Sequence, residues 1–217
     1  MGVSGKVVIT GGEGDLARVI ATAFRETGHE VLAPGRDELD VTDSAEVEAF
    51  FKLHPPGLLV CNAGITRDAP LLKMREQDWD EVLSVNLRGA ALCAKAALRG
   101  MIRARAGHIV FISSFSALHP PAGQAAYAAA KAGLIGLAKS LAKETGPAGI
   151  RVNAVLPGFL ETKITRDVSE ARRATVKAEH VLGRVNTPDA VAAFLVTLHL
   201  QLAHTSGQVF QLDSRVA

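Results

Sequence analysis

The sequence predicts an α/β fold in which helices cover both faces of a mainly parallel sheet. Short runs rich in β-branched residues alternate with longer amphipathic segments, which is the pattern of repeated strand–helix–strand units. Several of these runs are apolar without alternation, as expected of strands that are buried on both faces. The 217 residues, of which 48% are hydrophobic and 21% charged, have the length and composition of one globular domain, predicted to span residues 1–217.

Six segments have the composition of buried strands. They are residues 6–10, 30–33, 57–61, 108–113, 150–155 and 208–212. Between the second and third of them the connection is unusually short. Only ten residues separate residue 32 from the helix start predicted at Asp43, which is too few for a full crossover helix and a further strand. This part of the regular repeat is therefore expected to be abbreviated.

Helical spacing and capping signals place helices between the strands. Apolar residues recur at helical spacing from Leu16 to Phe24, and Gly28 ends that helix. Asp43 and Glu46 form a capping-box pattern at the start of the next one. The remaining predicted helices are residues 76–103, with a break near Gly89, residues 127–144, and a last helix opened by Thr187 and Pro188.

Charge and cysteine content exclude several classes of function. A net charge of +2 with scattered acids and bases gives no electrostatic footprint for nucleic acid or an anionic membrane. Cys61 and Cys93 lie in apolar runs without disulfide or zinc-site spacing, so we expect buried free thiols and no metal. No signal peptide and no membrane-spanning stretch is recognisable, which predicts a cytoplasmic protein.

A glycine-rich turn follows the first predicted strand. Residues 10–16 read Thr-Gly-Gly-Glu-Gly-Asp-Leu and open a helix. Glycines let the backbone approach a pyrophosphate, and a helix N-terminus supplies oriented N–H groups and a positive dipole end. In this context the turn predicts the dinucleotide site of a Rossmann doubly wound fold, whereas by itself it is equally consistent with an ordinary tight turn.

The end of the second predicted strand bears on the choice of dinucleotide. A basic side chain there accommodates the 2′-phosphate of NADP, and Arg36 supplies a cation. We therefore predict NADP(H) as the preferred cofactor, with NAD(H) as the alternative. The alternative rests on two features. Arg36 can pair with Asp37 or Glu38 instead, and the turn itself contains the carboxylates of Glu13 and Asp15.

Tyr127 and Lys131 stand four residues apart on one predicted helix, so both side chains share a face. A free phenol with a pKa of about 10 is a poor acid-base catalyst near neutrality. A neighbouring ammonium is expected to lower that pKa toward a useful value. Ser114 lies at the end of the preceding strand, thirteen positions before Tyr127, where a serine by itself is usually a turn residue.

Taken together, these motifs resemble the short-chain dehydrogenase/reductase family. Residues 107–114 and 123–133 resemble the 3-oxoacyl-(acyl-carrier-protein) reductases of its classical branch, and Pro157, Gly158 and Thr162 fit the motif at the nicotinamide end. The glycine turn and the short loop after it are instead similar to dTDP-4-dehydrorhamnose reductase-like members. At the tail, Ser214 and Arg215 replace the usual pair of glycines.

The resemblance implies a Rossmann sheet of about seven strands and two sets of site residues. The implied catalytic residues are Asn86, Ser114, Tyr127 and Lys131. The implied cofactor-binding residues are Thr10, Gly11, Gly12, Gly14, Asp15, Leu16, Arg36, Asp40, Val41, Asn62, Ala63, Gly64, Tyr127, Lys131, Pro157, Gly158, Leu160 and Thr162.

The implied reaction is reversible hydride transfer between a nicotinamide and a small-molecule carbonyl or secondary alcohol, including 3-oxoacyl thioesters. In it Tyr127 donates a proton, Ser114 orients the substrate oxygen, Lys131 holds the nicotinamide ribose, and Asn86 holds a water that resupplies protons. The resemblance also implies a homotetramer or homodimer, and it makes residues 163–184 the segment that covers the substrate.

Two other functions remain open from the sequence. The glycine turn and the short second loop are compatible with a nucleotide-sugar reductase or epimerase. The departures from the family pattern at Asp15, Ala17 and Ser214 are compatible with a non-catalytic NADP-binding sensor or scaffold. The complete set of four catalytic positions favours an enzyme.

Overall fold

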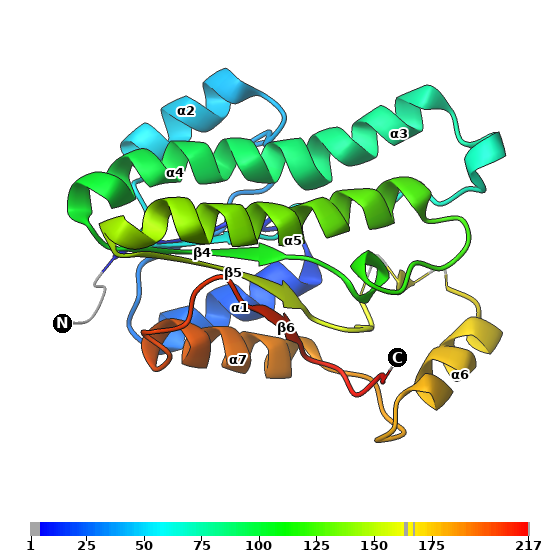
Figure 1. Ribbon diagram of the computed structural model, residues 1–217. Helices are drawn as coiled ribbons and strands as arrows, with labels where there is room; N and C mark the ends of the chain where they lie inside the picture. The colour runs from blue at the N-terminus through cyan, green and yellow to red at the C-terminus, as the bar shows by residue number, and fades with distance from the viewer. Residues whose placement is uncertain (1–4, 163–164, 167, 217) are drawn as a thin grey trace.

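Six parallel strands form the central sheet in the computed structural model, which describes residues 5–162, 165–166 and 168–216 (Figure 1). Across the sheet their order is β2-β1-β3-β4-β5-β6. The strands are β1 (Val7–Ile9), β2 (Val31–Leu32), β3 (Leu58–Cys61), β4 (Gly107–Ile112), β5 (Ile150–Leu156) and β6 (Val209–Gln211). Each overlaps one of the six runs found in the sequence, and the parallel α/β fold is confirmed.

The strand count corrects the expectation of about seven. After β2 the described chain turns immediately, with the Gly12 amide donating to the Pro34 carbonyl at 2.8 Å and the Leu39 amide donating to the Gly35 carbonyl at 3.0 Å. Leu39 and Val41 then pack into the core, and the chain enters the next helix. These residues are used in turns, so none remains between β2 and that helix for another strand and crossover.

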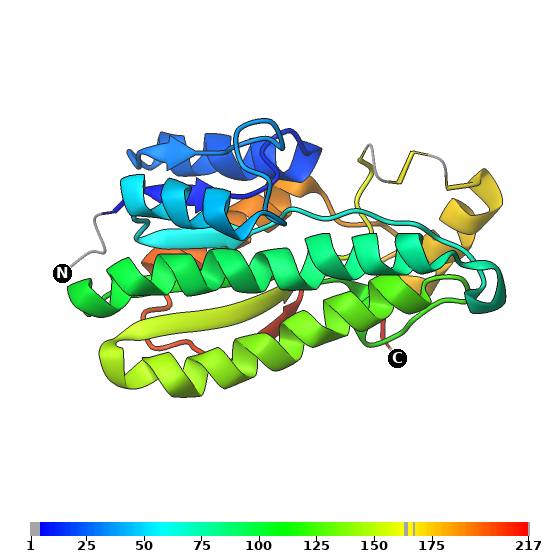
Figure 2. The same cartoon turned by 90° about the horizontal axis from the view of Figure 1, so that it is seen from above.

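Helices cover both faces of the sheet (Figure 2). On one side lie α1 (Asp15–Glu26) and α7 (Pro188–Leu200), and on the other lie α2 (Ser44–Leu53), α4 (Ala90–Ala104) and α5 (Ala125–Thr145). Helix α3 (Glu76–Leu83) leads into α4 through a π-helical segment, η2 (Ser84–Gly89), and α6 (Glu170–Glu179) lies beyond the carboxyl ends of the strands. Among the described residues, short 3-10 turns include η1 (Leu71–Lys73), η3 (Phe115–Ala117) and η4 (Gly146–Ala148).

Alternate side chains along the strands pack into two separate hydrophobic cores, one on each face of the sheet. Val8, Leu59 and Ile109 pack with the helices α2, α4 and α5. Val7 and Val60 pack with α1 and α7 on the opposite face. Because both sides of the strands are covered, the sequence shows continuous apolar runs instead of alternation.

Local signals in the sequence explain where the helices begin and end. The Asp43 carboxylate caps α2 by accepting from the amides of Ala45 and Glu46. The predicted capping box is only half formed, since the Glu46 carboxylate accepts from the Asp40 amide at 2.9 Å. Gly28 adopts a φ of 82° just after α1, and the break expected near Gly89 is the π-helical segment.

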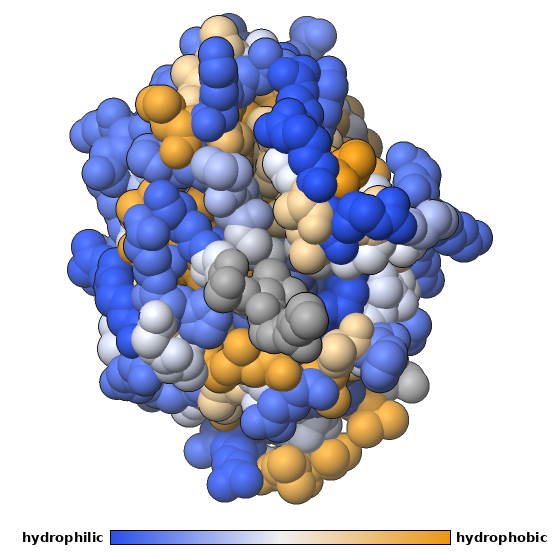
Figure 3. Space-filling model, turned by 90° about the vertical axis from the view of Figure 1, so that its left-hand side faces the viewer, coloured by the Kyte–Doolittle hydropathy of each residue, from blue (hydrophilic) through white to orange (hydrophobic). Residues whose placement is uncertain are grey.

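The two edges of the sheet differ in character. At the carboxyl edge the strand ends meet α6 and the C-terminal tail (Figure 1). The view from the amino edge shows a surface dominated by hydrophilic residues, with hydrophobic areas between them (Figure 3). In the ranges that the structure describes, none of the helices combines the length and apolarity that crossing a membrane requires.

Candidate active site

The glycine turn is tied to the loop after β3. The Thr10 hydroxyl oxygen accepts from the amides of Asn62 and Ala63, both at 3.1 Å, and the Asn62 side chain donates to the Thr10 carbonyl at 3.1 Å. Gly14 is the N-cap residue of α1, so the first amides of this helix face the turn. These contacts fix two loops of neighbouring strands in one position at the carboxyl edge.

Small residues in these loops are required by close packing. Gly11 has a φ of 69°, and a Cβ added there would lie 2.8 Å from the Ala63 Cα. A Cβ on Gly12 would lie 1.8 Å from the Ala33 carbonyl oxygen, where no side chain fits. Gly11 therefore shapes the loop that faces the cavity, and Gly12 allows the turn to approach β2.

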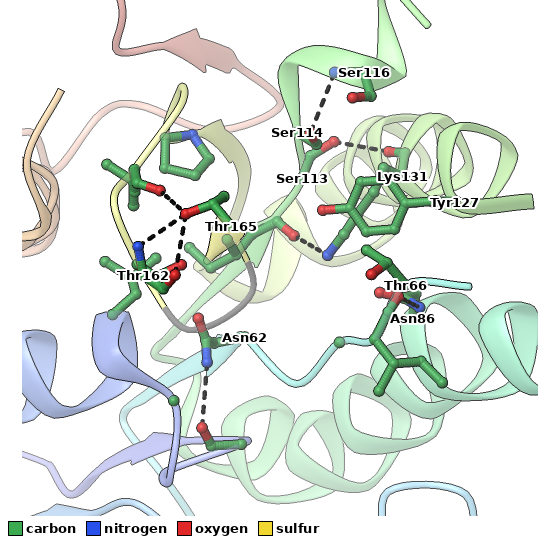
Figure 4. Close-up of a pocket in the computed structure, with 18 of the residues that line it drawn as sticks. Asn62, Thr66, Asn86, Ser113, Ser114, Ser116, Tyr127, Lys131, Thr162 and Thr165 are labelled. Atoms are coloured by element: carbon green, nitrogen blue, oxygen red, sulfur yellow. Dashed lines mark hydrogen bonds between the residues drawn. The ribbon is translucent and has the colours of Figure 1, made fainter. Parts of the chain in front are cut away.

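A cavity of about 760 Å³ opens above these loops, at the carboxyl edge of the sheet (Figure 4). The structure brings nearly all of the predicted site residues to its wall. Thr10 and Gly12 do not line it and instead support the turn from behind. The predicted residues that line it are Gly11, Gly14, Asp15, Leu16, Arg36, Asp40, Val41, Asn62, Ala63, Gly64, Asn86, Ser114, Tyr127, Lys131, Pro157, Gly158, Leu160 and Thr162.

Tyr127 and Ser114 meet on one wall of the cavity. Tyr127 lies in the first turn of α5 and is half-buried, and Ser114 caps η3 at the end of β4 by accepting from the Ser116 amide at 3.2 Å. Burial raises the pKa of Tyr127 above its ordinary value, while a hydrogen bond with Ser114 lowers it and the charge of Asp68 raises it. The net direction is upward, so the phenol is protonated at neutral pH.

The neighbouring ammonium of Lys131 was expected to bring the pKa of Tyr127 below its ordinary value, whereas burial raises it. The Lys131 Nζ lies 5.6 Å from the centroid of the tyrosine ring and donates to the Ile112 carbonyl at 2.8 Å. Burial lowers the pKa of Lys131 itself to about 8. The carbonyl of Lys131 in turn accepts from the Ser113 hydroxyl at 2.8 Å, which anchors α5 to the end of β4. Desolvation is the largest cause of the pKa shift of each of these two side chains.

Asn86 lies in the π-helical segment, a backbone form that often occurs at functional sites. Its amide nitrogen donates to the carbonyls of Val82 and Ile65, both at 2.9 Å. Its carbonyl oxygen is buried, and among the described residues it has no hydrogen-bond partner. A Cβ added on Gly64 would lie 2.6 Å from this oxygen and 3.4 Å from the Lys131 Nζ, so both atoms border one small space.

Comparison with known proteins places this geometry in a family. The sequence profile described as Enoyl-(Acyl carrier protein) reductase matches residues 5–214. A 3-oxoacyl-(acyl-carrier-protein) reductase of Vibrio cholerae is 33% identical, and the corresponding enzyme of Thermotoga maritima is 36% identical, each over 98% of both chains. The Escherichia coli enzyme is 38% identical over 91% of this chain and 86% of its own.

The chain belongs to the short-chain dehydrogenase/reductase family. It is an oxidoreductase related to the 3-oxoacyl-(acyl-carrier-protein) reductases, and the family cofactor is NAD(H) or NADP(H). Three observations fit such a dinucleotide. The N-terminus of α1 faces the cavity, Gly11 and Gly64 line it without side chains, and the buried Asn86 carbonyl oxygen has no hydrogen-bond partner among the described residues.

In this short-chain dehydrogenase/reductase the loop after β2 is rich in charge. Arg36 is exposed and pairs with Asp40 at 3.7 Å, whereas Asp37 and Glu38 were the alternative partners considered from the sequence. Hydrogen bonds from Thr42 lower the pKa of Asp40. A Cβ added on Gly35 would lie 2.9 Å from a Glu13 carboxylate oxygen, so that acid also borders the loop.

The segment after β5 closes the cavity on another side. Leu160 is buried, and the Thr165 hydroxyl donates to its carbonyl at 2.6 Å and accepts from the Thr162 amide at 2.9 Å. Gly158 has a φ of 86°. Residues 163, 164 and 167 of the predicted substrate-covering segment lie outside the described residues, and its later part contains α6.

Several cavity residues were not identified from the sequence. They come from separate elements, and the clearest are Asp68, Phe115, Gln124, Arg172 and Arg215. Gln124 links two loops, since it accepts from the Ser116 hydroxyl at 2.8 Å and donates to Asp68 at 2.7 Å. Phe115 directly follows a motif residue, and Gln124 lies within the motif of residues 123–133. Arg172 lies in the predicted substrate-covering segment, and Arg215 was noted as a departure from the family pattern, so each of these four had a signal, which Asp68 lacked.

Proposed function

We propose that the protein catalyses reversible reduction of a carbonyl compound to a secondary alcohol with a nicotinamide dinucleotide, and that 3-oxoacyl thioesters are its substrate class. The observation that carries the proposal is a single cavity with two ends. One end is lined by the glycine turn at Gly11 and Gly14, and the other by Ser114, Tyr127 and Lys131. The names of the relatives support the thioester class.

The dinucleotide would be held along the carboxyl edge of the sheet. The amides at the start of α1 suit the pyrophosphate, and Asp40 and Val41 suit the adenine end. The nicotinamide end would lie between Gly64 and the segment of Pro157 and Gly158. When bound, the nicotinamide supplies a hydride to the carbonyl carbon or accepts one from the alcohol carbon.

The side chains on the cavity wall formed by Ser114 and Tyr127 would transfer the proton and orient the substrate oxygen. Tyr127 is protonated at neutral pH and donates to the substrate oxygen as negative charge develops there. The Ser114 hydroxyl donates to the same oxygen and orients it. The ammonium of Lys131 stabilises the phenolate that remains. A water bound between the Asn86 carbonyl oxygen and Lys131 would return a proton from solvent to Tyr127. This role is supported by the Asn86 oxygen, which is buried and has no hydrogen-bond partner among the described residues.

NADP(H) is the proposed preference over NAD(H). The support is the exposed guanidinium of Arg36, which is free to reorient because a solvent-exposed ion pair with Asp40 at 3.7 Å is weak. The carboxylate of Glu13 beside Gly35 acts in the opposite direction, because it would repel a 2′-phosphate. The balance of these two side chains sets the ratio of the two affinities.

A panel of substrates assayed with NADPH and NADH tests the proposed function. Acetoacetyl-CoA, simple ketones and a nucleotide 4-keto sugar represent the three candidate classes. Oxidation of NADPH with acetoacetyl-CoA, lost in Tyr127→Phe, is the expected result. Turnover of the nucleotide sugar alone would favour the reductase or epimerase alternative, which the short loop after β2 supports. Tight NADPH binding without turnover of any substrate would favour a sensor or scaffold.

Assembly and location are also proposals. A homotetramer or homodimer would use the long helices α4 and α5, which lie on one side of the sheet (Figure 2). Light scattering at several concentrations measures this state. The reducing cytoplasm is the proposed compartment, supported by Cys61 and Cys93, which are both buried free thiols.

A further inference from the structure

The C-terminal tail places Arg215 at the cavity wall that carries Ser114 and Tyr127. The guanidinium carbon of Arg215 lies 3.5 Å from the centroid of the Phe115 ring, a close cation–π stack. Phe115 directly follows Ser114, and the two residues form the start of the η3 turn. Both Phe115 and Arg215 line the cavity. A tail residue is therefore in contact with the segment that carries the serine hydroxyl.

A buried ion pair holds Arg215 in this position. Its Nε and Nη2 donate to the same Asp213 carboxylate oxygen, at 2.7 and 2.5 Å. The side chain of Arg215 is 8% exposed and that of Asp213 is fully buried. Asp213 is itself packed against Gly158, where an added Cβ would lie 2.6 Å from the Asp213 Cβ. Two N–H groups on one carboxylate fix the plane of the guanidinium, which a lysine could not do.

The same tail residues also contact α6, the helix beyond the carboxyl ends of the strands. His180 and Arg215 form an antiparallel bridge, and the Val181 amide donates to the Ser214 carbonyl at 3.1 Å. The Glu179 carboxylate lies 3.9 Å from the Arg215 Nη1 and 3.5 Å from the Arg172 Nη1. The tail thus connects the end of α6 to the wall formed by Phe115.

Building on the proposed function, we propose that Arg215 is a positioning residue for the substrate side of the site. Its guanidinium fixes the ring of Phe115, and through it the main chain that carries Ser114, so that the serine hydroxyl stays aligned with Tyr127. Misplacement of a catalytic group by about 1 Å can cost about 100-fold in rate. Arg215 acts through Phe115 and Ser114 and is not one of the residues assigned to the dinucleotide, so its removal should lower turnover much more than cofactor affinity.

The first experiment measures Arg215→Ala in the full-length protein, with acetoacetyl-CoA and NADPH. The expected result is a fall in kcat of about tenfold, with the Kd for NADPH unchanged within about twofold. Arg25→Ala is the matched control, because Arg25 is an exposed arginine in the last turn of α1, away from the cavity, and it should keep wild-type values. Wild-type kcat in Arg215→Ala would overturn the proposal.

A double-mutant cycle separates positioning from a general effect on stability. If Arg215 acts through the serine hydroxyl, Arg215→Ala costs little further activity in a Ser114→Ala background. The same fold-loss in both backgrounds would contradict the proposal and indicate an unrelated structural effect. Single-turnover assays at high enzyme concentration keep the residual rate of Ser114→Ala measurable.

Phe115→Leu covers the case in which Arg215→Ala fails to fold, because it removes the aromatic face and leaves the ion pair with Asp213 in place. It should reproduce the fall in kcat, and wild-type kcat in this variant would likewise overturn the proposal. Failure of the proposed function itself is recognised separately, by undiminished turnover in Tyr127→Phe.

Discussion

The Lys131 Nζ lies 5.6 Å from the centroid of the Tyr127 ring and donates its hydrogen bond to the Ile112 carbonyl, at 2.8 Å. The end of β4 therefore fixes the ammonium beside the phenol. In the proposed reaction the two side chains have separate tasks. The tyrosine would carry the proton, and the lysine would provide a charge whose position depends on the main chain of the sheet.

Replacing the phenol tests the acid directly. Tyr127→Phe keeps the ring and removes the hydroxyl, so we expect turnover to fall by about 10²–10⁴-fold with little change in NADPH affinity. Lys131→Ala should reduce both turnover and affinity, because this side chain is expected to hold the nicotinamide ribose as well. Steady-state kinetics and fluorescence titration of NADPH measure the two quantities. Equal activity in the wild type and Tyr127→Phe would refute the assignment.

The kcat/KM for reduction should fall on the alkaline side of its pH profile. Burial lowers the pKa of Lys131 to about 8, whereas the pKa of Tyr127 is raised above its ordinary value, so the ammonium loses its charge first. We expect kcat/KM for the carbonyl substrate to fall about tenfold per pH unit above about pH 8. In Lys131→Met this fall should disappear, leaving a low rate. A flat wild-type profile up to pH 9.5 would argue against this role.

A substitution at Gly64 tests whether the small space between the Asn86 carbonyl oxygen and the Lys131 Nζ is needed for turnover. A Cβ in Gly64→Ala would lie 2.6 Å from the Asn86 carbonyl oxygen and displace it, so we expect a loss of turnover of about tenfold or more. Gly136→Ala is the control, because nothing lies within 4 Å of the added Cβ and alanine favours the helix by about 1 kcal/mol. Wild-type turnover in Gly64→Ala would show that the Asn86 oxygen does not contribute.

A pair of buried histidines predicts sensitivity to acid. The rings of His108 and His199 are stacked with centroids 5.5 Å apart, and their Nδ1 atoms lie 3.2 Å apart. Burial lowers the pKa of His199 to about 4, with the charge of Arg151 acting in the same direction, and it lowers the pKa of His108 well below its ordinary value. Both imidazoles are therefore neutral in the folded protein near pH 6.

The sign of the effect follows from proton binding. Between about pH 6.5 and 4 the unfolded chain binds protons at these histidines and the folded protein does not, so the free energy of unfolding falls as the pH falls. For His199 alone the loss amounts to at most about 3 kcal/mol by pH 4. Urea unfolding at each pH should show a smaller loss in His199→Gln and an unchanged loss in His204→Gln, which alters an exposed histidine. Identical curves for His199→Gln and the wild type would contradict this account.

Cofactor choice is predicted to respond in opposite directions to two substitutions. Arg36→Ala removes the cation near the end of β2 and should weaken NADPH about fivefold more than NADH. Glu13→Gln removes the carboxylate beside Gly35 and should strengthen NADPH relative to NADH. Fluorescence titration with both dinucleotides gives the ratio of the two Kd values. If that ratio does not change in Arg36→Ala, this side chain has no part in the preference.

Some features of the site were predictable because each depends on residues close together in the sequence. The glycine turn, the spacing of Tyr127 and Lys131, and the caps at Asp43 and Thr187 are local patterns, and the structure places them as expected. The net shift of the Tyr127 pKa was predicted with the wrong sign. The reason is that burial, which no local pattern reveals, dominates both groups.

The order of secondary structure elements, the parallel sheet and the family were determined by the sequence itself, because hydrophobic periodicity and short motifs encode them within a few tens of residues. Only the tertiary structure decided which separate segments meet. The stack of Arg215 on Phe115, the contact of the Asn86 carbonyl oxygen with the space beside Gly64, and the two facing histidines all join residues from distant parts of the chain. Contacts of this kind depend on packing around the whole sheet, and one-dimensional spacing carries no information about them.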